Sequence, residues 1–203
     1  VLSQPNGKYK VSKLNFEASA TAYIHGAAAA DVNGDGYPDV VMVDQNSNHL
    51  ARNQTPVFVL LNNKHGTFTR DASNFTELAN TAVWAVEMGD FGKNGTMQLW
   101  VAGHSGNNGA GSLLYTLTGS NKFTFAKRLT DDYVWTTPMD VVFKDNFAYI
   151  SRVNMDYSGV AIQRVDLTTN LATIVFSSAK VFTGPACTAI NTTWIDWIRI
   201  LDN

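Results

Sequence analysis

The chain has 203 residues, of which 45% are hydrophobic, so it is long enough and apolar enough to form one sizeable folded core. Fifteen Lys and Arg against seventeen Asp and Glu leave a net charge of −2. The sequence has no basic cluster that could neutralise a run of phosphates, which argues against a nucleic-acid partner. No apolar stretch approaches the ~18 residues that a membrane-spanning helix needs, which argues against membrane insertion.

The chain repeats itself along its length. The segment Asp31–Val43 aligns with Asp90–Ala102, and the same offset of 59 residues places Asn15 and Phe16 on Asn74 and Phe75. A later and more divergent copy includes Pro138–Ile150. The spacing shortens to about 50 residues, which is the period expected of propeller blades.

Each repeat has the local signals of short strands. The runs 40–43, 57–61 and 67–69 are rich in β-branched and aromatic residues, and 62–66 is typical of a hairpin loop. The alanine-rich segment 26–30 is too short for a helix, so we interpret it as an inner strand whose small side chains let blades converge on an axis. Each repeat therefore predicts about four antiparallel strands.

These signals predict an all-β fold, a β-propeller of four-stranded antiparallel blades with about four blades' worth of chain. A four-stranded sheet cannot bury both faces alone, so neighbouring copies must pack face to face. We expect a single propeller over residues 1–203 that is part of a larger propeller, with a closed four-bladed ring as the alternative. The expected units are an outer half blade (1–22), a blade with a metal loop (23–81), a degenerate blade (82–133), a divergent blade (134–185) and an inner half blade (186–203).

The most specific chemical feature is an Asp-rich loop. Calcium prefers six to eight oxygen ligands, and side chains at alternate loop positions converge when a glycine permits the sharp turn. The predicted ligands are side-chain oxygens of Asp31, Asn33, Asp35 and Asp39. Tyr37 would add its backbone carbonyl. An EF-hand is excluded because its twelfth position, which requires Glu, is Met42 here. A turn without metal is the alternative.

The second copy of this loop keeps only one of the carboxylates. Gly92, Asn94 and Gln98 stand where the first loop has Asn33, Asp35 and Asp39. We therefore expect the second loop to bind calcium poorly or not at all.

The segments 30–41 and 57–68 resemble the FG-GAP or VCBS-type repeat, the unit of integrin-α-like β-propellers. This resemblance implies that the Asp-rich loop joins the first two strands of a blade and holds a structural calcium ion. It also implies that ligands bind on the opposite face, on loops between blades.

Catalytic motifs are absent from the sequence. The four histidines have no metal-ligand spacing, and no nucleophile elbow or phosphate loop is present. We therefore predict a calcium-stabilised, non-catalytic extracellular module for binding, adhesion or assembly. Its partner would be a protein or glycan ligand, or neighbouring subunits and the remainder of the propeller. The alternatives are a polysaccharide-active, lyase-like enzyme or a sugar-binding lectin on the same propeller.

Three aromatic residues precede the Asp positions of successive repeats by nearly the same distance. They are His25, Trp84 and Trp135, which lie six, six and five residues before Asp31, Asp90 and Asp140. We predict that they form a partial ring that stacks on a sugar or peptide. Packing between blades is the alternative.

Four Asn-x-Ser/Thr sequences are possible glycosylation sites, at Asn53, Asn74, Asn94 and Asn191. They support an extracellular location mildly, because an Asn- and Thr-rich chain produces such sequences by chance. The stronger argument for that location is the millimolar calcium outside cells, which suits a weakly binding loop.

Overall fold

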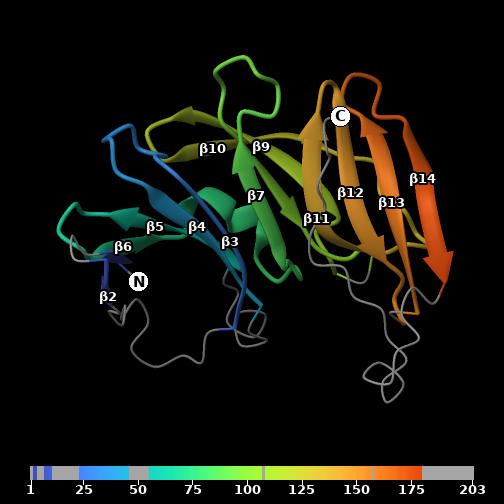
Figure 1. The fold of residues 1–203 in the computed structure, drawn as a ribbon, viewed down its shortest axis with the longest axis horizontal. Coiled ribbons are helices and arrows are strands. Elements are labelled where there is room, and N and C mark those ends of the chain that lie inside the picture. Colours follow the sequence, from blue (N-terminus) through green and yellow to red (C-terminus); the bar gives the residue numbers. More distant parts are fainter. Residues whose placement is uncertain are drawn as a thin grey trace.

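The structure is a computed structural model, and it has the predicted all-β architecture (Figure 1). It describes residues 2–3, 7–10, 23–45, 55–106, 108–156 and 158–179. Within these ranges no helix is long and apolar enough to cross a membrane.

Three four-stranded sheets follow one another along the chain, and each is a simple antiparallel meander. The first contains β3 (Ile24–Ala30), β4 (Asp39–Asp44), β5 (Val57–Asn62) and β6 (Phe68–Asp71). The second contains β7 (Ala85–Gly89), β8 (Gln98–Ala102), β9 (Ser112–Gly119) and β10 (Lys122–Arg128). The third contains β11 (Thr137–Lys144), β12 (Phe147–Val153), β13 (Gly159–Asp166) and β14 (Ala172–Ala179).

Two shorter features complete the described structure. A 3-10 helix, η1 (Ser73–Leu78), joins the first sheet to the second. The strands β1 (Leu2–Ser3) and β2 (Tyr9–Lys10) pair with each other. The predicted half blade 186–203 lies outside the described residues, as does most of the half blade 1–22.

The first strand of each sheet lies at the centre of the arrangement. Strand β7 packs beside β3 on one side and beside β11 on the other, and Figure 1 shows this order. The segment 26–30, predicted as an inner strand, belongs to β3. The three sheets are therefore arranged as successive blades, as the propeller prediction requires.

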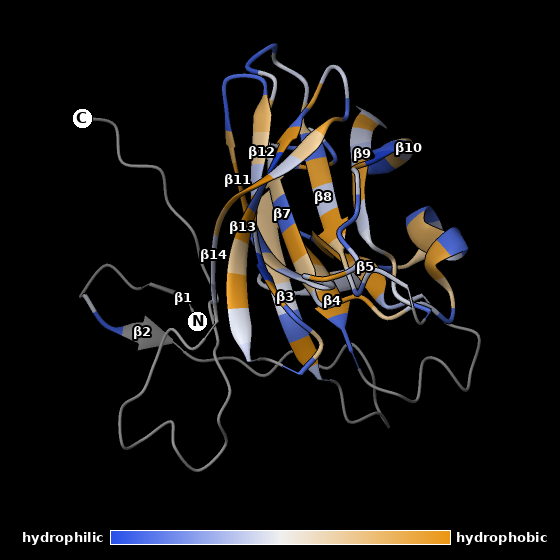
Figure 2. Ribbon diagram, turned by 90° about the vertical axis from the view of Figure 1, so that its right-hand side faces the viewer, coloured by the Kyte–Doolittle hydropathy of each residue, from blue (hydrophilic) through white to orange (hydrophobic). Residues whose placement is uncertain are grey.

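The second sheet is buried on both faces, because strand side chains alternate in direction. Val86, Leu99 and Val101 belong to the hydrophobic layer shared with the first sheet. Their neighbours Ala85, Trp100 and Ala102 belong to the layer shared with the third sheet. Figure 2 shows hydrophobic colouring along much of these central strands.

Gly26 explains how closely the inner strands approach each other. A Cβ atom at this position would lie 2.9 Å from the carbonyl oxygen of Trp84 and 3.3 Å from the amide nitrogen of Val86. Only glycine fits at this point without a shift of the backbone.

Candidate functional site: an axial cavity and an Asp-rich loop

A cavity of about 460 Å³ lies between the three inner strands, and we call it the axial cavity. It is lined by the first halves of β3 and β7, by the start of β11 and by one residue of β8. The lining residues are Tyr23, Ile24, His25, Gly26, Ala27, Trp84, Ala85, Val86, Glu87, Trp100, Met139 and Asp140. The Asp-rich loop follows the last residue of β3, so the cavity and the loop lie toward opposite ends of that strand.

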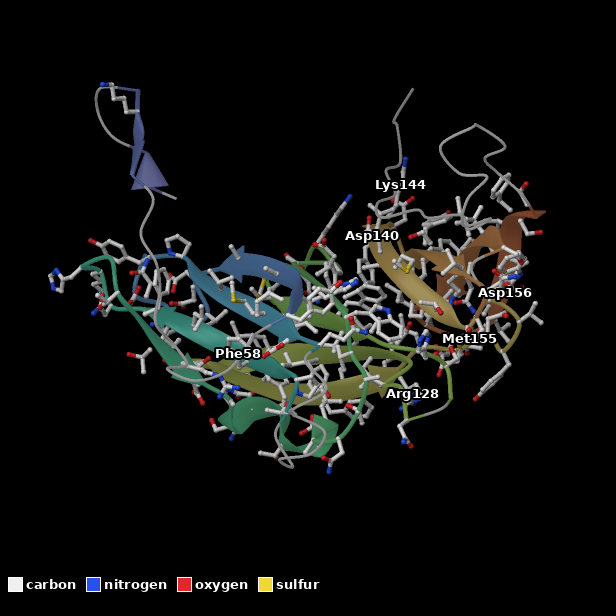
Figure 3. The ribbon with its side chains drawn as sticks, turned by 90° about the horizontal axis from the view of Figure 1, so that it is seen from below. Phe58, Arg128, Asp140, Lys144, Met155 and Asp156 are labelled. Carbon is white, nitrogen blue, oxygen red and sulfur yellow. The ribbon has the colours of Figure 1, made fainter. Side chains whose placement is uncertain are left out.

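Two carboxylates line the axial cavity from neighbouring blades. Glu87 is on β7, and Asp140, labelled in Figure 3, is on β11, the strand of the third sheet that packs beside β7. Burial of Glu87 raises the pKa of its carboxyl group, and the negative charge of Asp140 raises it further. The cavity thus holds a carboxyl group whose proton is retained to higher pH than usual.

Trp100 contributes a hydrogen-bond donor without an acceptor. Glu87 and Trp100 are opposite one another in the β7–β8 ladder, so their side chains emerge on the same face of the sheet. The Trp100 side chain is fully buried, and its Nε1 has no hydrogen-bond partner among the described residues. A buried donor in this condition costs about 1–3 kcal/mol unless an acceptor reaches it.

The structure brings together two of the three predicted ligand residues. His25 and Trp84 both line the axial cavity, and His25 Nδ1 donates to the carbonyl oxygen of Trp84 at 2.9 Å. Trp135 does not line it. Its ring packs at the start of β13, where a Cβ atom on Gly159 would lie 3.0 Å away. The predicted three-membered ring is therefore not assembled in this structure.

Trp84 is largely a packing residue between the second and third blades. Its side chain is 5% exposed, and its Nε1 donates to the carbonyl oxygen of Pro138 at 2.9 Å. The edge of its ring meets His104 with the ring centroids 3.8 Å apart. His104 Nδ1 lies 2.7 Å from the Thr137 hydroxyl, and burial lowers the pKa of the His104 imidazole.

The Asp-rich loop joins β3 to β4, the position implied by the family resemblance. Asp31 organises it, because Oδ1 accepts from the amides of Gly34 and Asp35 and Oδ2 accepts from Gly36 at 2.7 Å. The Gly36 amide is the main cause of the lowered pKa of Asp31. Gly36 has a φ of 83°, a left-handed conformation that favours glycine.

Asp39 is fully buried and connects three parts of the first blade. Its Oδ2 accepts from the Val32 amide at 3.0 Å, and its Oδ1 accepts from the Asn62 amide at 2.8 Å. Asp35 is nearer the surface, 3.6 Å from the Lys64 ammonium. No group of three or more His, Cys, Asp or Glu side chains in the described part of the chain is arranged to hold a metal ion.

The second loop has the same local geometry with fewer acidic residues. Asp90 Oδ1 accepts from the Asn94 amide at 3.0 Å, and Oδ2 accepts from Gly95 at 2.7 Å. These bonds match those that Asp31 receives from Asp35 and Gly36. The side-chain oxygens of Asp35 and Asn94 also make equivalent bonds, each accepting the amide two residues further on.

The predicted glycosylation positions differ in accessibility. Asn94 is exposed in the second loop, whereas Asn74 is partly buried and its Oδ1 accepts from the Phe123 amide. Asn53 and Asn191 lie outside the described residues.

Sequence reasoning missed Glu87 and Trp100 as site residues, and it used Asp140 only to align the repeats. One available signal was the position of Glu87, a charged residue inside the apolar run Val83–Met88, which the 59-residue offset aligns with the predicted inner strand 26–30. Charge at such a position indicates a cavity or a buried contact.

Comparisons with known proteins support the repeat assignment. Residues 31–101 match the family model described as an FG-GAP-like repeat, so this segment is an FG-GAP-type repeat, as predicted. A search of the curated proteins found no match.

Solved structures of an exo-β-1,3-galactanase from Phanerochaete chrysosporium share the fold. A variant with β-1,3-galactotriose is 17% identical with a TM-score of 0.52, and the match covers 84% of this chain and 42% of that one. The galactanase with galactose is 16% identical with a TM-score of 0.50, covering 88% of this chain and 41% of that one. This chain thus spans less than half the length of those structures.

These matches correct one prediction. The absence of catalytic motifs led to the expectation that the chain is not an enzyme, but solved structures that share its fold include those of a galactanase. The reasoning failed because catalytic groups on a propeller can come from separate blades and need not form a motif in sequence. At 16–17% identity the likeness shows the fold alone.

Proposed function

We propose that this chain is a carbohydrate-recognising propeller module that acts outside the cell and binds a saccharide in the axial cavity. One observation carries this proposal: two carboxyl groups, from Glu87 and Asp140, line a cavity between three blades that is also lined by the exposed ring of Tyr23. Aromatic faces stack on the apolar faces of sugar rings, and carboxyl groups hydrogen-bond to sugar hydroxyls. The fold shared with a galactanase whose structures contain galactose and galactotriose supports the same class of ligand.

The size of the cavity favours a saccharide over a protein ligand. Small-molecule sites measure about 300–1,000 Å³, and the axial cavity falls in that range at about 460 Å³. A stable protein interface needs about 800 Å² from each partner. A concave site between three inner strands therefore suits a small saccharide better than a protein partner.

Calcium in the Asp-rich loop is the second part of the proposal. Asp31, Asn33, Asp35, Asp39 and the Tyr37 carbonyl offer hard oxygen donors, the chemistry that calcium prefers. Each carboxylate has about four lone-pair sites, so the amides that it accepts do not exhaust it. The second loop keeps its shape with Asn94 in the place of Asp35, so that shape does not require the charge of Asp35, and a bound cation would account for it.

The extracellular location follows from the calcium proposal and is supported by the FG-GAP-like repeat. A single loop of this kind need not bind calcium tightly if it works at the millimolar calcium found outside cells. The exposed sequon at Asn94 is accessible to glycosylation in that setting.

Titration calorimetry with galactose and β-1,3-galactotriose tests the saccharide site. We expect saturable binding that weakens at least about tenfold in Glu87→Ala, since a hydrogen bond to a charged group contributes about 1.5–3 kcal/mol. Tyr133→Ala is the matched control, because Tyr133 is 77% exposed and does not line the cavity. Absence of binding, or equal affinity in Glu87→Ala, contradicts the proposal. Assay of released reducing sugar in the same samples shows whether binding leads to cleavage.

A further inference from the structure

We infer that the Lys64 ammonium group competes with calcium for the Asp-rich loop, so that this residue sets the calcium concentration at which the first blade is stabilised. This inference rests on the calcium part of the proposed function and names a residue that regulates the same site. A positive charge held beside a cation site raises the concentration of cation needed to fill that site.

Lys64 contacts two of the five residues predicted to bind calcium. Its Nζ lies 3.6 Å from Asp35 Oδ2 and 5.1 Å from the centroid of the Tyr37 ring. Asp35 is predicted to supply a carboxylate oxygen to the ion, and Tyr37 is predicted to supply its backbone carbonyl. The ammonium group is therefore already paired with a carboxylate that the ion needs.

Hydrogen bonds fix the β5–β6 hairpin loop that carries Lys64. The Asn62 amide donates to Asp39 Oδ1 at 2.8 Å, and Asn62 Nδ2 donates to the Pro38 carbonyl at 3.1 Å. The Lys64 amide donates in turn to Asn62 Oδ1 at 3.0 Å, and Lys64 has a left-handed φ of 70°. Because Asp39 belongs to the predicted ligand set, the contacts that anchor the hairpin also keep Lys64 beside the Asp-rich loop.

Asp35 is the ligand on which the competition acts. Its Oδ1 accepts from the Tyr37 amide at 2.9 Å, whereas its Oδ2 faces the Lys64 ammonium and accepts from Asn33 Nδ2 at 3.3 Å. To coordinate calcium, this carboxylate has to release the ammonium group or keep it as a close neighbour of the ion. The first choice loses the attraction of the ion pair, and the second sets a single positive charge against a double one.

The exposure of the ion pair allows this exchange to occur. The side chains of Lys64 and Asp35 are 44% and 23% exposed. The ammonium group can therefore move into solvent, and an ion can reach the carboxylate from solvent. A surface ion pair of this kind contributes little to stability by itself, so its main effect is on the cation that shares Asp35.

Titration calorimetry with calcium chloride on the full chain tests the competition. Lys64→Met removes the charge and should lower the calcium dissociation constant about three- to tenfold at low ionic strength, with a smaller effect in about 1 M salt. Lys64→Arg keeps the charge and should bind calcium as the original chain does. Lys93→Met is the matched control, because Lys93 is an exposed lysine of the second loop with a left-handed φ of 52°. It removes the same charge and should leave the calcium affinity unchanged.

Thermal unfolding of the same variants separates competition from a change in the fold. In chelator, Lys64→Met should melt at or below the temperature of the original chain, because it loses the ion pair with Asp35. At a calcium concentration that half-saturates the original chain, it should melt at a higher temperature than that chain. Equal or weaker calcium affinity in Lys64→Met, or an equal gain in Lys93→Met, overturns the inference and leaves the calcium site standing. Failure of both the original chain and Lys64→Met to bind calcium overturns the inference together with the calcium proposal.

Discussion

Asp39 is a buried carboxylate whose role in folding can be separated from calcium binding. Both oxygens accept backbone amides, from Val32 and Asn62, and the side chain has no exposed surface. Replacing it with alanine leaves two buried N–H groups without an acceptor, each costing about 1–3 kcal/mol. The carboxylate thus fixes the loop to β5 whether or not a metal ion is present.

We predict that Asp39→Ala lowers the free energy of unfolding by about 2–6 kcal/mol in the presence of a chelator. Urea denaturation measures this loss. Asp35→Ala is the matched variant, because Asp35 is partly exposed and its ion pair with Lys64 lies at the surface. Its effect in chelator should stay within about 1 kcal/mol. Similar losses in the two variants would contradict a role in folding that Asp39 has and Asp35 lacks.

His104 predicts a loss of stability in mild acid. Burial holds the pKa of its imidazole below 6.5 in the folded chain. Above pH 6.5 both states leave the imidazole neutral, so it contributes no pH dependence there. As the pH falls below 6.5, the unfolded chain binds a proton that the folded chain resists, and unfolding becomes more favourable.

Thermal unfolding at about pH 7.5 and about pH 5.5 tests this prediction. The melting temperature should be lower at the acidic pH, and His104→Gln should reduce the difference. Glu87 acts in the opposite direction, because its raised pKa contributes stability at low pH that is lost as the pH rises above 4.5. An unchanged pH dependence in His104→Gln would show that other groups cause it.

At the scale of elements, the contact between β3 and β7 depends on the absence of one side chain. We predict that Gly26→Ala destabilises the fold by about 1–3 kcal/mol, because the new Cβ atom would press on the Trp84 carbonyl at 2.9 Å. Gly119→Ala is the control, since the nearest atom to its Cβ is Lys122 Cβ at 4.0 Å. Equal melting temperatures for Gly26→Ala and the original chain would show that the inner strands can move apart.

The elements that sequence predicts well are those that local pattern controls. The inner strand at 26–30, the runs around 40–43 and 57–61 and the loop between them all lie in the first sheet as expected. The repeat also places Asp90 in a loop with the geometry of the first. These features depend on turn residues and on the alternation of apolar and polar residues within one blade. Both patterns can be read directly from the sequence.

The axial cavity could not be predicted in the same way. Glu87, Trp100 and Asp140 meet because β7, β8 and β11 come together between blades, and no spacing in the sequence records that contact. Trp84 and Trp135 occupy equivalent positions in the repeat. Equivalence predicts where each residue lies along its blade, but it does not predict which neighbouring residues cover each ring. Trp84 became a buried contact to Pro138, whereas Trp135 packs near Gly159.

On the scale of the whole molecule, the loops between the first two strands of the first and second blades each dock on the following blade. In the first loop, the Val32 carbonyl accepts from the Asn121 amide at 2.7 Å, and the Asn33 carbonyl accepts from the Ser120 hydroxyl at 3.2 Å. In the second loop, Phe91 stacks on Phe143 of the third blade, with ring centroids 3.7 Å apart. The Asp-rich loop therefore stands at the interface between the first and second blades.

This placement predicts that calcium stabilises two blades together. Ordering the first loop should also hold the β9–β10 hairpin that contacts it, so hydrogen exchange should slow at Asn121 as well as at Gly36. The melting temperature should rise with calcium, because a ligand at a hundredfold excess over its dissociation constant adds about 2.7 kcal/mol. Asp35→Ala should remove both effects. Identical melting curves with calcium and with chelator would contradict calcium binding. Slower hydrogen exchange confined to the first loop would contradict only the proposed coupling of that loop to the second blade.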